Sequence, residues 1–423
     1  MPKTIFWLGA LFAATAFAAD ESARVHFHFS FGLGKVAADT IRVSSNTVYD
    51  PERGYGFEPG GELKAVENAV TSGKLFYFSV AAPEGNYRVT ATLGDDQATA
   101  VTTIKAELRR LMVEKVTTAA GKFEKRTFIV NIRTPQIAGG GEVRLKPREK
   151  AGEARAWDEK LTLEFTNSHP ALRELEIERV TNIPTIYIAG DSTSTDQPVE
   201  PFNSWGQMLT RFLKPDIAVA NHGESGESLR SFFGEKRFDK IMSLIRQGDY
   251  LFIQMGHNDQ KDTTAGAGAF TSYNDFLKQM VAAARVKGAT PVLITPVNRL
   301  TFDADGKITN SLGDFPEAVR RLAEENHVAL IDLNAMSKPL YEALGIVESH
   351  TAFAGKDTTH HSNYGSYELA KCIVQGIVDA KLPLASHISA DFHGFDPAHP
   401  DPVSKFEIPA EPARGAGERP LGN

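Results

Sequence analysis

The spacing of the apolar residues changes once along the chain, near Pro184. Before this residue, short runs alternate apolar and polar side chains with a period of two, and turns rich in Gly, Pro and Asp separate them. The expected strands are 25–31, 75–80, 87–93, 101–104, 127–132 and 161–165. Such a series of short strands predicts an antiparallel β-sandwich.

After Pro184, apolar strands alternate with amphipathic helices. The expected strands are 185–189, 217–220, 250–255, 291–295 and 329–333, and the expected helices include 273–286, 315–325 and 364–380. This alternation predicts βα units and a parallel sheet. The sequence therefore predicts a sandwich domain over 19–182, an α/β domain with a five-stranded parallel sheet over 183–382, and an irregular, proline-rich tail over 383–423.

The first residues have the pattern of a secretory signal peptide. Lys3 precedes an apolar run over 5–14, and small residues at Ala16 and Ala18 flank Phe17, so cleavage is expected after Ala18. The apolar run is shorter than the about 20 residues that cross a bilayer, so no membrane anchor is expected. We expect residues 1–18 to be a signal peptide and the protein to be periplasmic or secreted, in a bacterium.

Charge and cysteine content exclude several classes of partner and site. The 46 basic and 53 acidic residues give a net charge of −7, which argues against a nucleic acid partner. The single cysteine, Cys372, excludes an intramolecular disulfide and a cysteine-based zinc site. We expect no metal and no organic cofactor, and the sequence does not indicate an oligomeric state.

Polar residues follow the expected strands where the carboxyl ends of a parallel sheet bind ligands. Ser192 follows the first strand at a predicted strand-to-helix turn and is a candidate nucleophile. Gly226 lies beyond the second strand, and the carboxamide of Asn258, beyond the third, can donate a hydrogen bond to a bound oxygen. Asp357 precedes His360 by three residues, so its carboxylate can orient the imidazole and leave Nε2 as a general base.

Taken together, these motifs resemble the four blocks of the SGNH (GDSL-type) hydrolases. The matching residues, in order over 185–382, are Gly190-Asp191-Ser192, Gly226, Gly256-His257-Asn258-Asp259 and Asp357-x-x-His360. The resemblance implies a flavodoxin-like sheet, Ser192 as nucleophile, His360 as base and Asp357 as the residue that orients it. It also implies an oxyanion hole made by the amides of Ser192 and Gly226 and the side chain of Asn258.

Within that family, the segment is most similar to rhamnogalacturonan acetylesterases. The similarity lies in Thr193-x-Thr195, in Trp205-Gly206 and in the Asp-x-Thr-His motif that ends at His360. The N-terminal half, with Phe29-x-Phe31-Gly32 and the segment 51–57, resembles the galactose-binding-like sandwich of two-domain bacterial members. One departure is that glutamates flank the Ser225-Gly226 pair, whereas the fungal enzymes carry a small residue before the glycine and an arginine after it.

The resemblance implies an exported carbohydrate O-acetylesterase whose partner is an acetylated plant cell-wall polysaccharide, most specifically rhamnogalacturonan. Acetylxylan or another acetylated glycan is the nearest alternative substrate. A lipase or thioesterase of the same fold is a more distant alternative. A glycan-binding protein with an inactive esterase domain is the alternative from another class.

Other residues have both a functional and a structural interpretation. Arg299, after the fourth strand, is a candidate contact for a galacturonate carboxylate, and the alternatives are a structural ion pair or a solvated side chain. Tyr55 and Phe57 could stack on a sugar or pack within a turn. We expect His361 to be adjacent to the base without acting as the base itself. We expect Asp259 to have a structural role and to hold the loop after the third strand.

Overall fold

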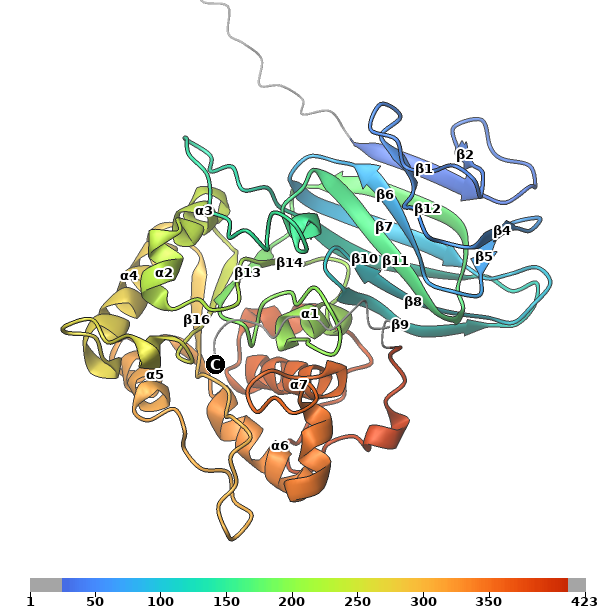
Figure 1. Cartoon of the computed structure of the whole chain (residues 1–423). Coiled ribbons are helices and arrows are strands. Elements are labelled where there is room, and N and C mark those ends of the chain that lie inside the picture. Colours follow the sequence, from blue (N-terminus) through green and yellow to red (C-terminus); the bar gives the residue numbers. More distant parts are fainter. Residues whose placement is uncertain (1–24, 410–423) are drawn as a thin grey trace, which may run out of the picture.

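A computed structural model describes residues 25–409 of the chain. The predicted signal peptide lies outside the described residues. Figure 1 shows a β-rich part, coloured blue to green, beside an α/β part, coloured green to red. The last antiparallel strand ends at Val180 and the first parallel strand begins at Thr185, so the architecture changes where the apolar spacing changes.

The N-terminal part consists of two β-sheets that pack face to face. The seven-stranded sheet has the order β10-β7-β12-β1-β2, with β5 paired to β12 and β4 to β5, and the other sheet has the order β3-β6-β11-β8-β9. Their pairs are antiparallel except for β1 with β2. The strands are β1 His26–Phe31, β2 Ile41–Val43, β3 Tyr55–Phe57, β4 Leu63–Ala65, β5 Val70–Ser72, β6 Phe76–Ala81, β7 Gly85–Leu93, β8 Ala100–Ala106, β9 Arg110–Thr118, β10 Glu124–Ile132, β11 Lys160–His169 and β12 Ala171–Val180.

Alternating side chains from the two sheets form the sandwich core. Phe29 and Phe31 of β1 point inward and pack edge-on against Phe78 of β6, with ring centroids 5.2 Å apart in each pair. His26 and His28 lie on the outer face of β1, where they contact Glu176 and Thr40. This alternation confirms the predicted antiparallel β domain.

The expected strand list omits the three-residue strands β2, β3, β4 and β5 and the long strands β9 and β12. In β9, residues 110–113 are all buried, with Met112 and Val113 in the sandwich core and Leu111 in the core of the α/β part. Apolar and polar residues therefore do not alternate in this half of the strand. In β12, the register shifts between Leu172 and Glu174, which interrupts the alternation there.

The C-terminal part contains the predicted five-stranded parallel sheet, with the order β14-β13-β15-β16-β17. Numbered within this sheet, the order is 2-1-3-4-5, which is the flavodoxin-like arrangement. The strands are β13 Thr185–Gly190, β14 Ala218–Asn221, β15 Tyr250–Gln254, β16 Thr290–Ile294 and β17 Ala329–Ile331. The α-helices are α1 Trp205–Leu209, α2 Leu229–Gly234, α3 Arg237–Leu244, α4 Asn274–Val286, α5 Phe315–Glu325, α6 Leu333–Glu348 and α7 Asn363–Asp379.

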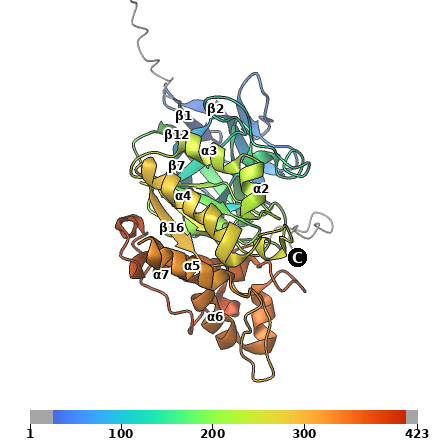
Figure 2. The ribbon, with the colours of Figure 1, turned by 90° about the vertical axis from the view of Figure 1, so that its left-hand side faces the viewer.

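Helices cover both faces of this sheet, as Figure 2 shows. Apolar side chains of α1, α6 and α7 pack on one face, and those of α2, α3, α4 and α5 pack on the other. Shorter helical turns complete this part at Thr210–Phe212, Asp259–Lys261, Ala269–Tyr273, Ser349–Ala352, Pro383–His387 and Val403–Lys405. The strand expected over 329–333 is shorter, because the Asp332 side chain caps α6 by accepting from the Ala335 amide.

The proline-rich tail packs onto the α/β part as far as residue 409. Leu384, Ile388 and Ile408 are buried in the core that α1, α6 and α7 share. The tail also reaches the sandwich, where Glu407 pairs with Lys115 of β9 at 2.6 Å.

The sandwich contacts the α/β part through the turn between β8 and β9. Gln207 of α1 donates from Nε2 to the Leu108 carbonyl at 2.6 Å, and Thr210 donates from Oγ1 to the Leu111 carbonyl at 2.7 Å. Arg110 of β9 donates to the Val219 carbonyl of β14 at 3.1 Å. These buried contacts place the sandwich beside α1 and β14.

Candidate active site

Ser192 lies in a tight turn directly after β13. Asp191 holds this turn, because its Oδ1 accepts from the Thr193 amide at 2.9 Å. Its backbone carbonyl also accepts from the amides of Ser194 and Thr195. A Cβ on Gly190 would lie 1.9 Å from Ser194 Oγ, so a larger residue there would force this hydroxyl group to move. The predicted helix does not follow at once, since α1 begins only at Trp205. The tight turn, rather than a helix, fixes the position of the serine.

Ser192, His360 and Asp357 form a continuous hydrogen-bonded chain. His360 Nε2 lies 2.9 Å from Ser192 Oγ, and His360 Nδ1 lies 3.0 Å from Asp357 Oδ2. The other carboxylate oxygen of Asp357 accepts from the His360 amide at 2.9 Å, which holds the loop before α7 around the ring. All three side chains are buried. The structure therefore brings together the three residues that the sequence predicts to act together.

Asp191 belongs to a separate buried pair beneath the serine. Its Oδ2 lies 3.2 Å from His257 Nδ1, and His257 Nε2 lies 3.0 Å from the Val297 carbonyl. Burial alone would raise the pKa of Asp191, but His257 and the hydrogen bonds from Thr193 hold this pKa below its usual value. The pair links the turn after β13 to the loops after β15 and β16.

The three predicted oxyanion donors, which are the amides of Ser192 and Gly226 and the side chain of Asn258, differ in the contacts that hold them. Residues 224–227 form a turn in which the Glu227 amide donates to the Glu224 carbonyl at 3.3 Å, and Gly226 has a φ of +79° that favours glycine. Within residues 25–409, the amides of Ser192 and Gly226 make no hydrogen bond to a protein acceptor. Asn258 donates from Nδ2 to the Glu227 carbonyl at 3.0 Å and retains a second N–H on the same nitrogen.

Gln197, which is not among the residues predicted from the sequence, connects this turn to Ser192. Its Nε2 donates to the Ser192 carbonyl at 2.7 Å and lies 3.3 Å from Ser225 Oγ. The ring of Phe202 packs edge-on against His360, with centroids 6.0 Å apart. Gln197 and Phe202 lie in a loop without regular spacing, so no sequence pattern marks them.

Arg299 lies next to the loop that carries Asp357 and His360. It makes only long hydrogen bonds, and these are to neutral groups. Its Nε is 3.2 Å from Thr359 Oγ1, and its Nη2 is 3.4 Å from the His257 carbonyl. Among the described residues it has no carboxylate partner within ion-pair distance. Its guanidinium thus has no direct ion-pair partner, although the charge of Asp191 acts on it from a longer distance.

The other candidates have structural partners. His361 is buried and its Nε2 lies 2.7 Å from Tyr341 Oη, so the base and its neighbour have separate environments. Asp259 accepts from the Leu229 amide at 2.8 Å, which ties the loop after β15 to α2. Tyr55 and Phe57 pack against Phe29 and other core rings. These contacts favour packing over sugar stacking for the two aromatic residues.

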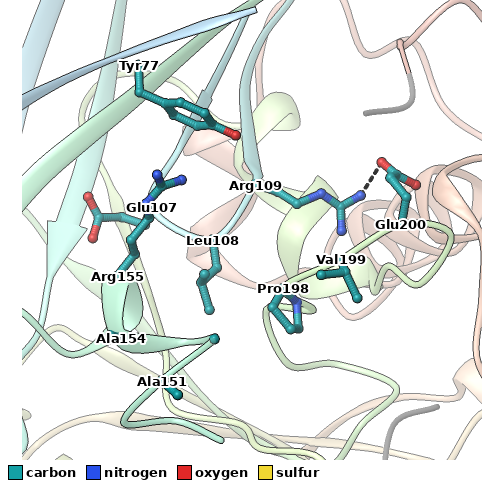
Figure 3. Close-up of a pocket in the computed structure, with 11 residues that line it drawn as sticks. Tyr77, Glu107, Leu108, Arg109, Ala151, Ala154, Arg155, Pro198, Val199 and Glu200 are labelled. Carbon is teal, nitrogen blue, oxygen red and sulfur yellow. Dashed lines mark hydrogen bonds and ion pairs between the residues drawn. The ribbon is translucent and has the colours of Figure 1, made fainter. Parts of the chain in front are cut away.

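A cavity of about 340 Å³ lies between the sandwich and the loop that carries Gln197. Figure 3 shows Tyr77, Glu107 and Arg155 on one side and Pro198, Val199 and Glu200 on the other. The Arg155 guanidinium lies over the Tyr77 ring, 4.2 Å from its centroid, and no carboxylate among the described residues pairs with it. Arg109, which also lines the cavity, pairs with Glu200.

A buried serine, histidine and aspartate at the carboxyl end of a parallel sheet, beside free amide donors, are the arrangement that hydrolases with a serine nucleophile use. Comparison with known proteins agrees, because residues 188–365 match the model of the GDSL-like Lipase/Acylhydrolase family. The chain is also similar to the rhamnogalacturonan acetylesterase RhgT of Bacillus subtilis, at 40% identity over 48% of this chain and 93% of that protein. The chain belongs to the GDSL (SGNH) hydrolase family and is a hydrolase of the esterase type.

Two further comparisons extend beyond the α/β part. The uncharacterized esterase YxiM of B. subtilis is 29% identical over 82% of this chain and 90% of its own length. The X-ray structure of YxiM covers 85% of this chain and 99% of its own, with 26% identity and a TM-score of 0.48.

Between residues 25 and 409, no helix is long and apolar enough to cross a membrane.

Proposed function

We propose that the protein is an exported bacterial O-acetylesterase that removes acetyl groups from a plant cell-wall polysaccharide, most specifically rhamnogalacturonan. The observation that carries the proposal is the chain of hydrogen bonds from Asp357 through His360 to Ser192. The similarity to RhgT, a rhamnogalacturonan acetylesterase, supports an esterase that acts on acetylated rhamnogalacturonan.

The proposed reaction is a two-step acyl transfer. Ser192 Oγ attacks the acetyl carbonyl while His360 Nε2 takes its proton, and the carbonyl oxygen becomes an oxyanion between the amides of Ser192 and Gly226 and the Asn258 side chain. The oxyanion collapses, the sugar oxygen leaves with the proton from His360, and an acetyl ester remains on Ser192. Water then attacks this ester, with His360 again accepting and returning a proton, and acetate is released.

The structure supplies two cations that a uronate substrate could use. The net charge of −7 opposes the approach of a polyanion, so binding would depend on local cations. Arg299 lies beside the His360 loop, and Arg155 lies in the cavity that the Gln197 loop shares with the sandwich. Neither guanidinium has a carboxylate partner among the described residues, so each could pair with a galacturonate carboxylate.

Acetate release from a panel of substrates tests the proposal. The panel contains acetylated rhamnogalacturonan, acetylated xylan and p-nitrophenyl acetate, with the same enzyme preparation on each. We expect the highest kcat/KM on acetylated rhamnogalacturonan. A higher value on acetylated xylan would assign a neutral glycan, and binding of glycan without acetate release from any substrate would indicate a binding protein.

A further inference from the structure

A long segment of the sandwich domain extends to the turn that contains Gly226. Residues 133–159, here called the arm, connect β10 to β11, and Figure 1 shows this segment leaving the sandwich toward α3. Val143, Ala156 and Trp157 of the arm form a small core with Leu108. Arg237 of α3 anchors the arm by pairing with Glu149 at 2.6 Å, with both side chains fully buried.

Two cations of the arm bind the carbonyl that precedes Gly226. Lys146 donates from Nζ to the Ser225 carbonyl at 2.9 Å, and Arg148 donates from Nη2 to the same oxygen. The same two residues pair with the glutamates that flank the Ser225-Gly226 pair, Lys146 with Glu227 and Arg148 with Glu224. The glutamate side chains are at most 5% exposed, so each cation is held by a desolvated partner.

This contact determines the direction of the Gly226 amide. In a planar trans peptide, the C=O and N–H groups point in opposite directions. Because the Ser225 carbonyl points to the arm, the Gly226 N–H points away from it, and this N–H makes no hydrogen bond to a protein acceptor within the described residues. Gln197 bonds the Ser192 carbonyl and reaches Ser225 Oγ, which places the turn against the nucleophile.

We infer that Lys146 and Arg148 are positioning residues that fix the Gly226 amide as an oxyanion donor, so that the sandwich domain completes the catalytic site. The inference rests on the proposed function and assigns a catalytic contribution to the N-terminal domain. Two cations on the carbonyl oxygen also polarise the peptide group, which strengthens its N–H as a donor. The glutamates at positions 224 and 227, which depart from the fungal pattern, serve to hold these cations.

Two charge-neutral double variants of the full chain test the inference. The first variant is Lys146→Met with Glu227→Gln, and the second is Arg148→Met with Glu224→Gln. Each removes one carbonyl contact together with the glutamate that the cation pairs with. The second also takes Arg148 from Glu153, 3.4 Å away, but burial raises the pKa of Glu153 to about 8, so this carboxyl group is protonated at pH 7. On p-nitrophenyl acetate, we expect kcat to fall about tenfold to a hundredfold with KM within twofold of wild type, since one misplaced oxyanion donor affects mainly the transition state. Arg148→Lys retains a cation at the carbonyl and should keep kcat within about threefold of wild type.

A matched control lies at the other end of the arm. Lys240 of α3 bonds the Gln136 carbonyl of the arm and pairs with Glu84 at 2.7 Å, and it does not touch residues 224–227. Lys240→Met with Glu84→Gln should lower Tm as the test variants do but leave kcat unchanged. An equal fall of kcat in this control, or wild-type kcat in the two test variants, would overturn the inference. Failure of the proposed function would show differently, as Ser192→Ala retaining wild-type activity in the same assay.

Discussion

His360 Nε2 lies 2.9 Å from Ser192 Oγ, although the two residues are 168 positions apart in the chain. The serine is fixed by the turn after β13, and the histidine by the loop that Asp357 ties before α7. Both side chains are almost completely buried, so the hydrogen bond between them is shielded from water. The proposed nucleophile and base therefore lie within hydrogen-bond distance of each other, as acyl transfer requires.

Asn258→Ala tests the oxyanion hole. The change removes a donor to charge that develops only in the transition state, so kcat should fall on the order of 10² to 10³ with KM nearly unchanged. Steady-state kinetics on p-nitrophenyl acetate measure both constants. A higher KM with an unchanged kcat would show that Asn258 binds the substrate in its ground state instead.

Arg299→Gln tests the cation beside the His360 loop. Gln removes the charge and the two-pronged donor geometry, so kcat/KM on acetylated rhamnogalacturonan should fall roughly tenfold or more. The loss on p-nitrophenyl acetate should be smaller, because this substrate has no carboxylate. Arg285→Gln is the matched control, since Arg285 also donates to backbone carbonyls, at 2.8 and 3.0 Å, but at the end of α4. An equal loss of kcat/KM on the two substrates would mean that Arg299 only supports the loop that carries Asp357 and His360.

Arg155→Gln tests whether the cavity beside the Gln197 loop binds the polysaccharide. KM on acetylated rhamnogalacturonan should rise about threefold to tenfold, since the variant loses one charge-assisted contact, while kcat on p-nitrophenyl acetate should stay at the wild-type value. Arg53→Gln is the control, because Arg53 also lies over a tyrosine ring of the sandwich, 5.5 Å from its centroid. An unchanged KM on the polysaccharide would exclude a contribution of Arg155 to binding.

Glu107→Gln tests how a buried carboxyl group makes stability depend on pH. Burial raises the pKa of Glu107 from 4.5 to about 8, so the folded protein binds a proton that the unfolded chain has lost. The contribution of this proton to the free energy of unfolding is fully present below pH 4.5 and is lost as the pH rises through about 8. Gln cannot ionise and can still accept from the Thr162 amide, a bond of 3.0 Å in the wild type. Tm should therefore match wild type at about pH 5 and exceed it by several degrees at about pH 9; a constant difference would contradict this account.

The sequence was sufficient to predict that Ser192, His360 and Asp357 lie together, because these residues lie in short local motifs. Asp357 and His360 are three residues apart on one loop, and Ser192 follows directly after an apolar strand. Parallel strands end at a common edge, so the strand pattern also predicts where these motifs meet. The five parallel strands were predictable for the same reason, since each is a short apolar run.

The contacts between the domains could not be predicted in this way. Lys146 and Ser225 are 79 positions apart, and the arm that carries Lys146 has no periodic pattern. Strand β9 escaped prediction because the α/β part buries the face that a lone sandwich would expose. These features depend on how the domains pack, which the local spacing of residues does not encode.

Acetate release by Ser192→Ala and His360→Ala tests the central claim most directly. The two single variants and the double variant are assayed on acetylated rhamnogalacturonan and on p-nitrophenyl acetate, after melting curves show that each is folded. Because triad residues act as a unit, each single variant should lose roughly three or more orders of magnitude in kcat, and the double variant should be little worse. Retained activity in Ser192→Ala, or losses that multiply in the double variant, would contradict a serine nucleophile activated by His360.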